Sequence, residues 1–373
     1  MARLNECILY RDFEHGDLLA KMAEIMTLWE KDAADLKSKE GQFFECVNGL
    51  VEMAGLYGFS GNLWHCYLTF LLVNKENAFS TASEIRGAVK GSINELVLND
   101  FEIFKELYDF DLNVLDEAFG ISCCKVICDY INTGSNSKMF NSRIRDRICE
   151  MSRTLAGAET TEEFMADMVQ FYKDFGVGKL GLHKAFRVGR DENDKVEIQP
   201  ITRIAHVKLE DLIGYEIPKQ KLIENTEAFV RGRKANNCLL FGDAGTGKSS
   251  SIKGILNRYY DEGLRIIEVY KHQFQDLNDV IAQIKNRNYK FIIYMDDLSF
   301  EEFEIEYKYL KAVIEGGLEK KPDNILIYAT SNRRHLVRER AGDKLEVTDD
   351  DDLHSSDTVQ EKLSLVYRFG VRI

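Results

Sequence analysis

The sequence predicts an α/β fold, in which a helical N-terminal domain precedes a domain built on a parallel sheet. Three observations lead to this prediction. The chain has 373 residues, which is long for a single hydrophobic core. Up to about residue 180, apolar residues recur at steps of three and four, the period of amphipathic helices. From residue 209 onward, short apolar strands alternate with helical segments, which is typical of a parallel sheet covered on both faces.

The helical domain is predicted to span residues 1–183. One of its apolar stripes is formed by Leu18, Met22, Ile25, Met26 and Trp29. Further along, Thr160 and Glu163 have the spacing of a capping box, and Gly176 stands where a helix-ending glycine belongs. We interpret the aromatic residues of these stripes as core packing, and a binding groove is the alternative.

Composition and local patterns predict a cytoplasmic protein without membrane insertion. The first twenty residues mix charged and apolar positions, unlike a signal peptide. The longest apolar run, Leu63–Val73, is too short to span a bilayer and predicts a buried helix. Among the eight cysteines, Cys123, Cys124 and Cys128 cluster without a second pair at zinc-ligand spacing, so we interpret them as small buried side chains. The net charge of -13 argues against nonspecific binding of polyanions.

Residues 184–208 predict a β-hairpin and a linker. The apolar segments Ala185–Val188 and Val196–Ile198 flank a polar turn, and the period here changes from helical to alternating. The second domain is predicted to span residues 209–373, with Pro218 as the first residue of its first helix.

Five strands are predicted in the second domain, and they form a five-stranded parallel sheet. The strands are Cys238–Phe241, Ile266–Tyr270, Phe291–Met295, Ile325–Ala329 and the segment that starts at Val371. Helical segments separate the strands, so that each pair of neighbours can be parallel.

The strongest motif of the chain lies between the first of these strands and the helix that follows it. Residues 242–249 read Gly-Asp-Ala-Gly-Thr-Gly-Lys-Ser and match the phosphate-loop pattern in full. Its glycines let the backbone curl so that successive N–H groups face an anion. Lys248 supplies a cation for the β- and γ-phosphates, and the Ser249 hydroxyl is suited to Mg²⁺. The nucleotide-binding candidates here are Gly242, Asp243, Ala244, Gly245, Thr246, Gly247, Lys248, Ser249 and Ser250.

A pair of acids follows the third strand. Asp296 and Asp297 end the apolar run Phe291–Met295, where P-loop ATPases place the acid that organises magnesium. We expect Asp296 to act with Ser249 in binding Mg²⁺ and Asp297 to activate water as a general base. Glutamate is commoner at the second position, and Glu301 and Glu302 are alternative bases.

With these motifs the chain resembles the AAA+ ATPases. Leu212–Glu216, with Ile213, Gly214 and Tyr215 at its centre, is similar to the AAA+ segment that packs against adenine. By the same resemblance Asn332, in Ala-Thr-Ser-Asn, is the sensor 1 residue that orients the attacking water. Arg368, in Tyr-Arg-Phe-Gly, is the finger that acts on a neighbouring subunit's nucleotide. The resemblance therefore implies an ATPase that uses ATP and Mg²⁺.

More specifically, residues 211–370 look like the DUF815 group of bacterial predicted ATPases. The segments that carry this resemblance include Asp296–Phe300 and His354–Asp357. The chain ends before the helical lid that follows the arginine finger in AAA+ proteins, and without a lid we expect weaker nucleotide closure. With a lid, the family implies a homo-oligomer that remodels an unknown protein or nucleic-acid client.

Two other functions stay open at this point. A nucleotide-gated binding module with little turnover is favoured by Asp297 in place of glutamate and by the absent lid. A small-molecule kinase shares the phosphate loop, but the acid pair and Asn332 argue against it. The basic residues Arg333, Arg334, Arg338 and Arg340 form a run that we interpret as a solvated loop, with contact to nucleic acid or to a second subunit as the alternative.

Overall fold

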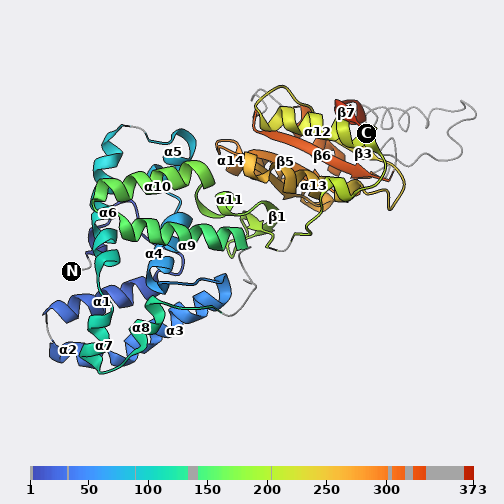
Figure 1. Cartoon of the computed structure of the whole chain (residues 1–373). Helices are drawn as coiled ribbons and strands as arrows, with labels where there is room; N and C mark the ends of the chain where they lie inside the picture. The colour runs from blue at the N-terminus through green and yellow to red at the C-terminus, as the bar shows by residue number, and fades with distance from the viewer. Residues whose placement is uncertain are drawn as a thin grey trace, which may run out of the picture. The chain divides into compact units, whose positions relative to one another are not determined.

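The chain divides into two compact units between Leu182 and His183. The computed structural model describes residues 3–31, 33–88, 90–132, 142–202, 204–300, 305–315, 322–332 and 365–373. Figure 1 shows helices in the first unit and a sheet flanked by helices in the second. The predicted fold class, a helical N-terminal part followed by an α/β P-loop domain, is confirmed.

The first unit contains eleven α-helices in the part of it that the structure describes. Their bounds are α1 Asp17–Lys31, α2 Ala33–Ser38, α3 Glu40–Tyr57, α4 Leu63–Asn74, α5 Ala78–Arg86, α6 Ser92–Asp109, α7 Asn113–Phe119, α8 Cys123–Cys128, α9 Ser142–Gly157, α10 Thr161–Phe175 and α11 Gly178–Leu182. Helix α4 is the predicted buried helix. Ten of its twelve residues are buried, so it forms the centre of this core and does not present one apolar face to it.

The predicted capping box at α10 forms only in part. The Thr160 side chain accepts a hydrogen bond from the Glu163 backbone N–H, and Gly176 ends the helix with a φ of 79°. The Glu163 carboxylate does not accept a hydrogen bond from the Thr160 backbone N–H, which is the second bond of a capping box. It accepts a hydrogen bond from the Glu159 backbone N–H at 2.9 Å, which satisfies a donor one residue earlier in the chain.

A buried carboxylate fixes the N-terminal segment of this unit. Asp100 on α6 is fully buried and accepts hydrogen bonds from the backbone N–H groups of Ile8, Leu9 and Tyr10 at 2.7–2.9 Å. Because burying a charge is costly unless hydrogen bonds replace its water, these three donors account for its position.

The cysteine cluster also has a structural explanation. The ligand atoms of Asp116, Cys123 and Cys124 lie within 4.8 Å of one another. However, the Asp116 carboxylate already accepts hydrogen bonds from the backbone N–H groups of Cys124 and Lys125 at the start of α8, and burial raises the pKa of Cys124. All eight cysteines lie in the described ranges, and each is a free thiol.

The second unit is organised around a seven-stranded sheet with the order β2-β1-β4-β5-β6-β3-β7. The strands are β1 Ala185–Arg190, β2 Val196–Pro200, β3 Cys238–Phe241, β4 Leu264–Glu268, β5 Lys290–Met295, β6 Ile325–Ser331 and β7 Val371–Arg372. The strand number differs from the predicted five because the hairpin joins the sheet. Strand β1 pairs in parallel with β4, and β2 pairs antiparallel with β1.

Helices cover both faces of this sheet. Their bounds are α12 Glu216–Val230, α13 Lys248–Tyr259, α14 Leu277–Ile284 and α15 Glu306–Glu315. Helices α12 and α13 share one apolar core with Leu240, Ile292 and Tyr328 of the strands. The connection from β3 to β4 runs along the sheet in one direction, and those from β4 to β5 and β6 run in the other. Right-handed crossovers therefore place α14 and α15 on the opposite face from α13.

Helix α12 begins earlier than predicted. Pro218 is its third residue, and Tyr215, with a φ of 56°, precedes the helix as its N-cap. Proline is tolerated there because the first four N–H groups of a helix have no intrahelical acceptor. Within the described residues, every helix is too short or too polar to cross a lipid bilayer.

We expect Asp100→Ala to lower the free energy of unfolding of the helical unit by about 3 kcal/mol, because three backbone N–H groups lose their charged acceptor. Both tryptophans of the chain, Trp29 and Trp64, lie in this unit, so urea denaturation followed by tryptophan fluorescence reports on it alone. Asp109→Ala is the matched control, since its carboxylate is exposed and pairs with Lys105 at the surface. Equal effects of the two substitutions would contradict the role of Asp100.

Candidate nucleotide-binding site

The candidate residues meet at one edge of the sheet because three neighbouring parallel strands end there. The phosphate loop follows β3, Asp296 and Asp297 follow β5, and Asn332 follows β6. Strand β6 lies between β5 and β3, so its end separates the acid pair from the phosphate loop. Ligands of open α/β sheets bind at this carboxyl edge.

The phosphate loop has the backbone that an anion site requires. Gly245 and Gly247 have φ values of 79° and 84°, which residues with a Cβ atom rarely adopt. Helix α13 begins directly after the loop at Lys248, and its N-cap, Gly247, has no side chain that could cap the first N–H groups. Those groups and the helix dipole therefore face the loop and favour negative charge. Thr246 braces the loop by donating a hydrogen bond to the Asp243 carbonyl.

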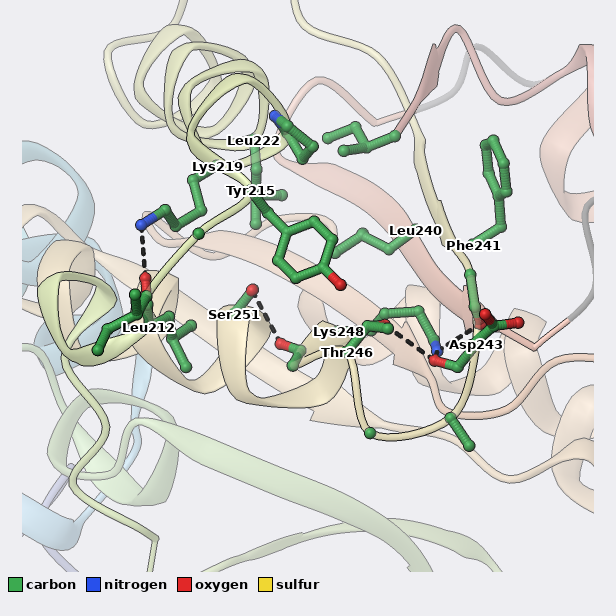
Figure 2. Close-up of a pocket in the computed structure, with 18 of the residues that line it drawn as sticks. Leu212, Tyr215, Lys219, Leu222, Leu240, Phe241, Asp243, Thr246, Lys248 and Ser251 are labelled. Carbon is green, nitrogen blue, oxygen red and sulfur yellow. Dashed lines mark hydrogen bonds between the residues drawn. The ribbon is translucent and has the colours of Figure 1, made fainter.

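Lys248 lies across the mouth of this loop (Figure 2). Its ammonium group donates to the carbonyl oxygens of Gly242 and Asp243 at 2.7 and 2.8 Å, and to Asn332 Oδ1 at 3.0 Å. All three acceptors are uncharged, so a phosphate oxygen would be a stronger partner for the same cation.

Asp296 is held by hydroxyl groups from three elements. Its Oδ1 atom accepts hydrogen bonds from Tyr294 at 2.6 Å, Thr330 at 2.6 Å and Ser249 at 2.8 Å. Partial burial alone would raise the pKa of Asp296. The three hydroxyl donors outweigh burial, so its pKa lies below the ordinary value. Asp296 is therefore a carboxylate at neutral pH.

The structure gives a physical reason for aspartate at position 297. Its φ is 50°, a left-handed conformation in which aspartate and asparagine are several-fold enriched among non-glycine residues. The turn is fixed on both sides, because the Asp297 backbone N–H donates to Thr330 Oγ1 and the Leu298 N–H donates to the Thr330 carbonyl. The Asp297 side chain then points to Asn332.

Asn332 joins the acid pair to the phosphate loop. Its Nδ2 donates to Asp297 Oδ1 at 2.8 Å, while its Oδ1 accepts the bond from Lys248. A continuous hydrogen-bonded chain thus runs from Lys248 through Asn332, Asp297 and Thr330 to Asp296. Four of the residues predicted from the sequence to be catalytic, phosphate-binding or magnesium-binding lie in this chain, and Ser249 is joined to it through Asp296.

A cavity of about 640 Å³ opens beside the loop, a volume within the usual range of ligand pockets. Figure 2 shows the Tyr215 ring between the first turns of α12 and the phosphate loop. Outside the loop, the cavity has an apolar wall that includes Ile213, Tyr215, Pro218, Leu222, Leu240 and Ile373. Ile213 is 95% exposed and Tyr215 is 60% exposed, so this wall offers apolar surface to a ligand.

The remaining candidates lie further from this network or outside the described residues. Ser250 is the third residue of α13 and is partly exposed. Arg368 forms an ion pair with Glu315 of α15 at 3.2 Å and is half exposed. Glu301, Glu302, the basic run of residues 333–340 and the segment His354–Asp357 fall outside the described residues.

Two residues that bond to Asp296, Tyr294 and Thr330, are not among the candidates from the sequence. Both stand in strands that read as continuous apolar runs, so their hydroxyl groups do not stand out. A signal was present for Tyr294, because residues two apart on a strand share a face and position 296 was already singled out. Thr330 belongs to the Ala-Thr-Ser-Asn segment, in which the resemblance gives a role only to the asparagine.

Comparison with known families bears on the same part of the chain. The family described as "Protein of unknown function (DUF815)" matches residues 182–373, just over half of the sequence. The chain belongs to the DUF815 family. The matched region of this DUF815 protein coincides with the α/β unit and contains the whole hydrogen-bonded chain from Lys248 to Asp296. No curated protein matches the chain.

Solved structures similar to this DUF815 protein share low sequence identity with it. The Thermotoga maritima RuvB Holliday junction branch migration motor is 18% identical over 44% of this chain and 46% of its own, with a TM-score of 0.30. DnaI is 20% identical over 43% of this chain and 85% of its own, with a TM-score of 0.30. C. elegans PCH-2 is 21% identical over 43% of this chain and 43% of its own, with a TM-score of 0.29. The chain thus spans less than half the length of RuvB and PCH-2, and we draw no functional conclusion from these matches.

The conformation of Asp297 predicts an unusual order of stability among its variants. We expect Asp297→Gly to be more stable than Asp297→Ala by about 1 kcal/mol, because only glycine adopts a positive φ without steric cost. Both variants lack the carboxylate, so their difference isolates the backbone. Calorimetry measures this difference in stability. The transition of the α/β unit is the one that tryptophan fluorescence does not follow, because both tryptophans lie in the helical unit. The opposite order, which an unstrained backbone would give, would disprove the left-handed conformation.

Proposed function

We propose that this DUF815 protein binds ATP with Mg²⁺ and hydrolyses it to ADP and phosphate. The observation that carries the proposal is the hydrogen-bonded chain that starts at the phosphate-loop lysine and runs through Asn332 and Thr330 to the two acids after β5. A phosphate loop alone is shared by many nucleotide-binding proteins. A carboxylate oriented by an amide beside that loop adds the group that hydrolysis needs.

The residues of the loop suit a triphosphate. The N–H groups of the loop and of the first turn of α13 would bind phosphate oxygens. Lys248 would exchange the Gly242 and Asp243 carbonyls for the β- and γ-phosphates, which are stronger acceptors. The apolar wall with Ile213 and Tyr215 would cover the adenine ring, and burial of this exposed surface adds affinity.

The Ser249 hydroxyl and the Asp296 carboxylate fit magnesium. Their oxygen atoms lie only 2.8 Å apart, and oxygen atoms are the hard ligands that Mg²⁺ prefers. A bound Mg²⁺ would neutralise charge that develops on the phosphates. The depressed pKa of Asp296 keeps this carboxylate ionised and ready to bind a cation or its water.

Asp297 is the proposed general base. Its Oδ1 accepts a hydrogen bond from Asn332 Nδ2, which fixes the orientation of the carboxylate. Its remaining acceptor sites can take the proton of a water molecule as that water attacks the γ-phosphorus, and the bond to ADP breaks. Asn332 would orient the same water, as its place between Lys248 and Asp297 suggests.

We further propose that catalysis is completed between subunits of a homo-oligomer, and that turnover remodels a client held by the helical unit. Arg368 would supply positive charge to a neighbouring nucleotide. Within one chain this arginine pairs with Glu315, an exposed ion pair that contributes little and that a phosphate can replace. The same pair favours a second candidate function, a binding module that holds ATP but turns it over slowly.

The first test is steady-state phosphate release from ATP and Mg²⁺ over a series of protein concentrations. We expect specific activity to rise with concentration, because the finger comes from a second subunit, and to vanish in Lys248→Ala together with nucleotide binding. Lys253→Ala is the control, since this lysine lies further along α13 and outside the loop. Tight ATP binding without release at any concentration would instead favour the binding module.

The second test addresses the finger and the base together. We expect Arg368→Ala to bind ATP normally and to hydrolyse it about a thousandfold more slowly, and Asp297→Asn to bind ATP but not turn it over. Mixing the two variants should restore activity, because roughly a quarter of the interfaces in a random ring would pair an intact Asp297 with an intact Arg368. Arg372→Ala, which removes a nearby charge beside Tyr367, should remain active. Failure of the mixture to regain activity would exclude an intersubunit finger.

A further inference from the structure

Tyr294 makes a contact that the phosphate loop and acid pair do not require. Tyr294 lies on β5 two residues before Asp296, which directly follows the strand, and residues two apart along an extended backbone point to the same face. Its phenol donates a hydrogen bond of 2.6 Å to Asp296 Oδ1. The ring belongs to the apolar core that α13 forms with the strands, while the oxygen at its tip reaches the site.

Tyr294 is buried in the core of the α/β unit. The side chain is only 6% exposed, and its surroundings include Ile252 and Leu256 of α13. A phenol carries its proton at neutral pH and so donates this hydrogen bond, and because the core already holds the ring, little conformational freedom is lost when a metal binds.

The number of hydrogen-bond donors to Asp296 indicates what the Tyr294 hydroxyl does. Three hydroxyl groups meet one oxygen, Oδ1, although a carboxylate oxygen offers about two lone pairs. Ser249 is the donor whose oxygen can leave to bind a metal. Tyr294 and Thr330 would then occupy both lone pairs of Oδ1 and fix the rotation of the carboxylate, with Oδ2 outside these three bonds.

We propose that Tyr294 is a positioning residue for the magnesium site: its hydroxyl, with that of Thr330, fixes the Asp296 carboxylate so that one oxygen is kept for the metal and its water. This inference rests on the proposed function. Hydrogen-bond partners of a metal-binding group set its orientation and basicity. We therefore expect Tyr294, a residue inside β5, to affect the affinity of the site for the metal.

The substitution that tests this role is Tyr294→Phe, which keeps the buried ring and removes one oxygen. Tyr328→Phe is the matched control. Tyr328 is the register neighbour of Tyr294 on β6 and is also buried, but its hydroxyl bonds to Asn225 and Thr226 of α12. Both variants thus lose a buried hydroxyl group at neighbouring positions of the sheet. Only Tyr294→Phe also loses a hydrogen bond to Asp296.

The measurement is binding of a fluorescent ATP analogue with an N-methylanthraniloyl group on the ribose, titrated with Mg²⁺ from an EDTA baseline. We expect Tyr294→Phe to need about tenfold more Mg²⁺ for half-maximal binding, with unchanged affinity in EDTA. Tyr328→Phe should follow the wild type in both. In an Asp296→Asn background, Tyr294→Phe should have no further effect, because the hydroxyl acts through that carboxylate.

Three results would overturn the inference: a wild-type Mg²⁺ requirement in Tyr294→Phe, an equal shift in Tyr328→Phe, or an undiminished effect in the Asp296→Asn background. Each of them leaves the proposed function intact if wild-type binding depends on Mg²⁺ and is lost in Lys248→Ala. Wild-type protein that does not bind the analogue, or that binds it equally well after Lys248→Ala, would instead refute the proposed function itself.

Discussion

The convergence of three hydroxyl groups on one oxygen of Asp296 depends on the whole architecture of the α/β unit. Ser249 comes from the start of α13, Tyr294 from inside β5 and Thr330 from β6. The three can meet only if β5 and β6 are neighbours in the observed register and α13 packs on the face to which Tyr294 points. Since hydroxyl hydrogen bonds tolerate only a few tenths of an ångström, a slip of one residue in either strand would abolish the arrangement and turn its side chains to the other face.

The charges of the network match the ligand that we propose, a metal-bound polyphosphate. The network contains one ammonium group, on Lys248, and two carboxylates, on Asp296 and Asp297. A triphosphate alone would be repelled by the two carboxylates. A divalent cation bound between them would attract both the carboxylates and the phosphates. The loop N–H groups and the α13 dipole contribute positive potential on the phosphate side. The acids and the loop therefore form complementary halves of one electrostatic arrangement, divided by the end of β6.

Much of this site follows from sequence because it rests on local patterns and one topological rule. The phosphate loop is contiguous, and acids or amides at the ends of buried parallel strands must meet at the same edge. The rest depends on distant pairing. The hairpin reads as a separate element, and only three pairs of residues between β1 and β4 make it part of the sheet. Likewise, nothing local tells whether the Tyr294 hydroxyl reaches Asp296 or ends in the core. At Thr160 and Glu163 the spacing predicts a reciprocal pair, but an adjacent N–H group competes for the carboxylate.

The hairpin has a mechanical consequence. The helical unit ends at Leu182 and β1 begins at Ala185, so almost no slack chain joins the two units. Tension applied along the chain from the helical unit would load β1 directly. The parallel pairing of β1 with β4 would carry that load into the sheet. Strand β4 in turn lies beside β5, which ends in the acid pair. Force on β1 would therefore pass through β4 and β5 to the edge of the sheet that holds Asp296.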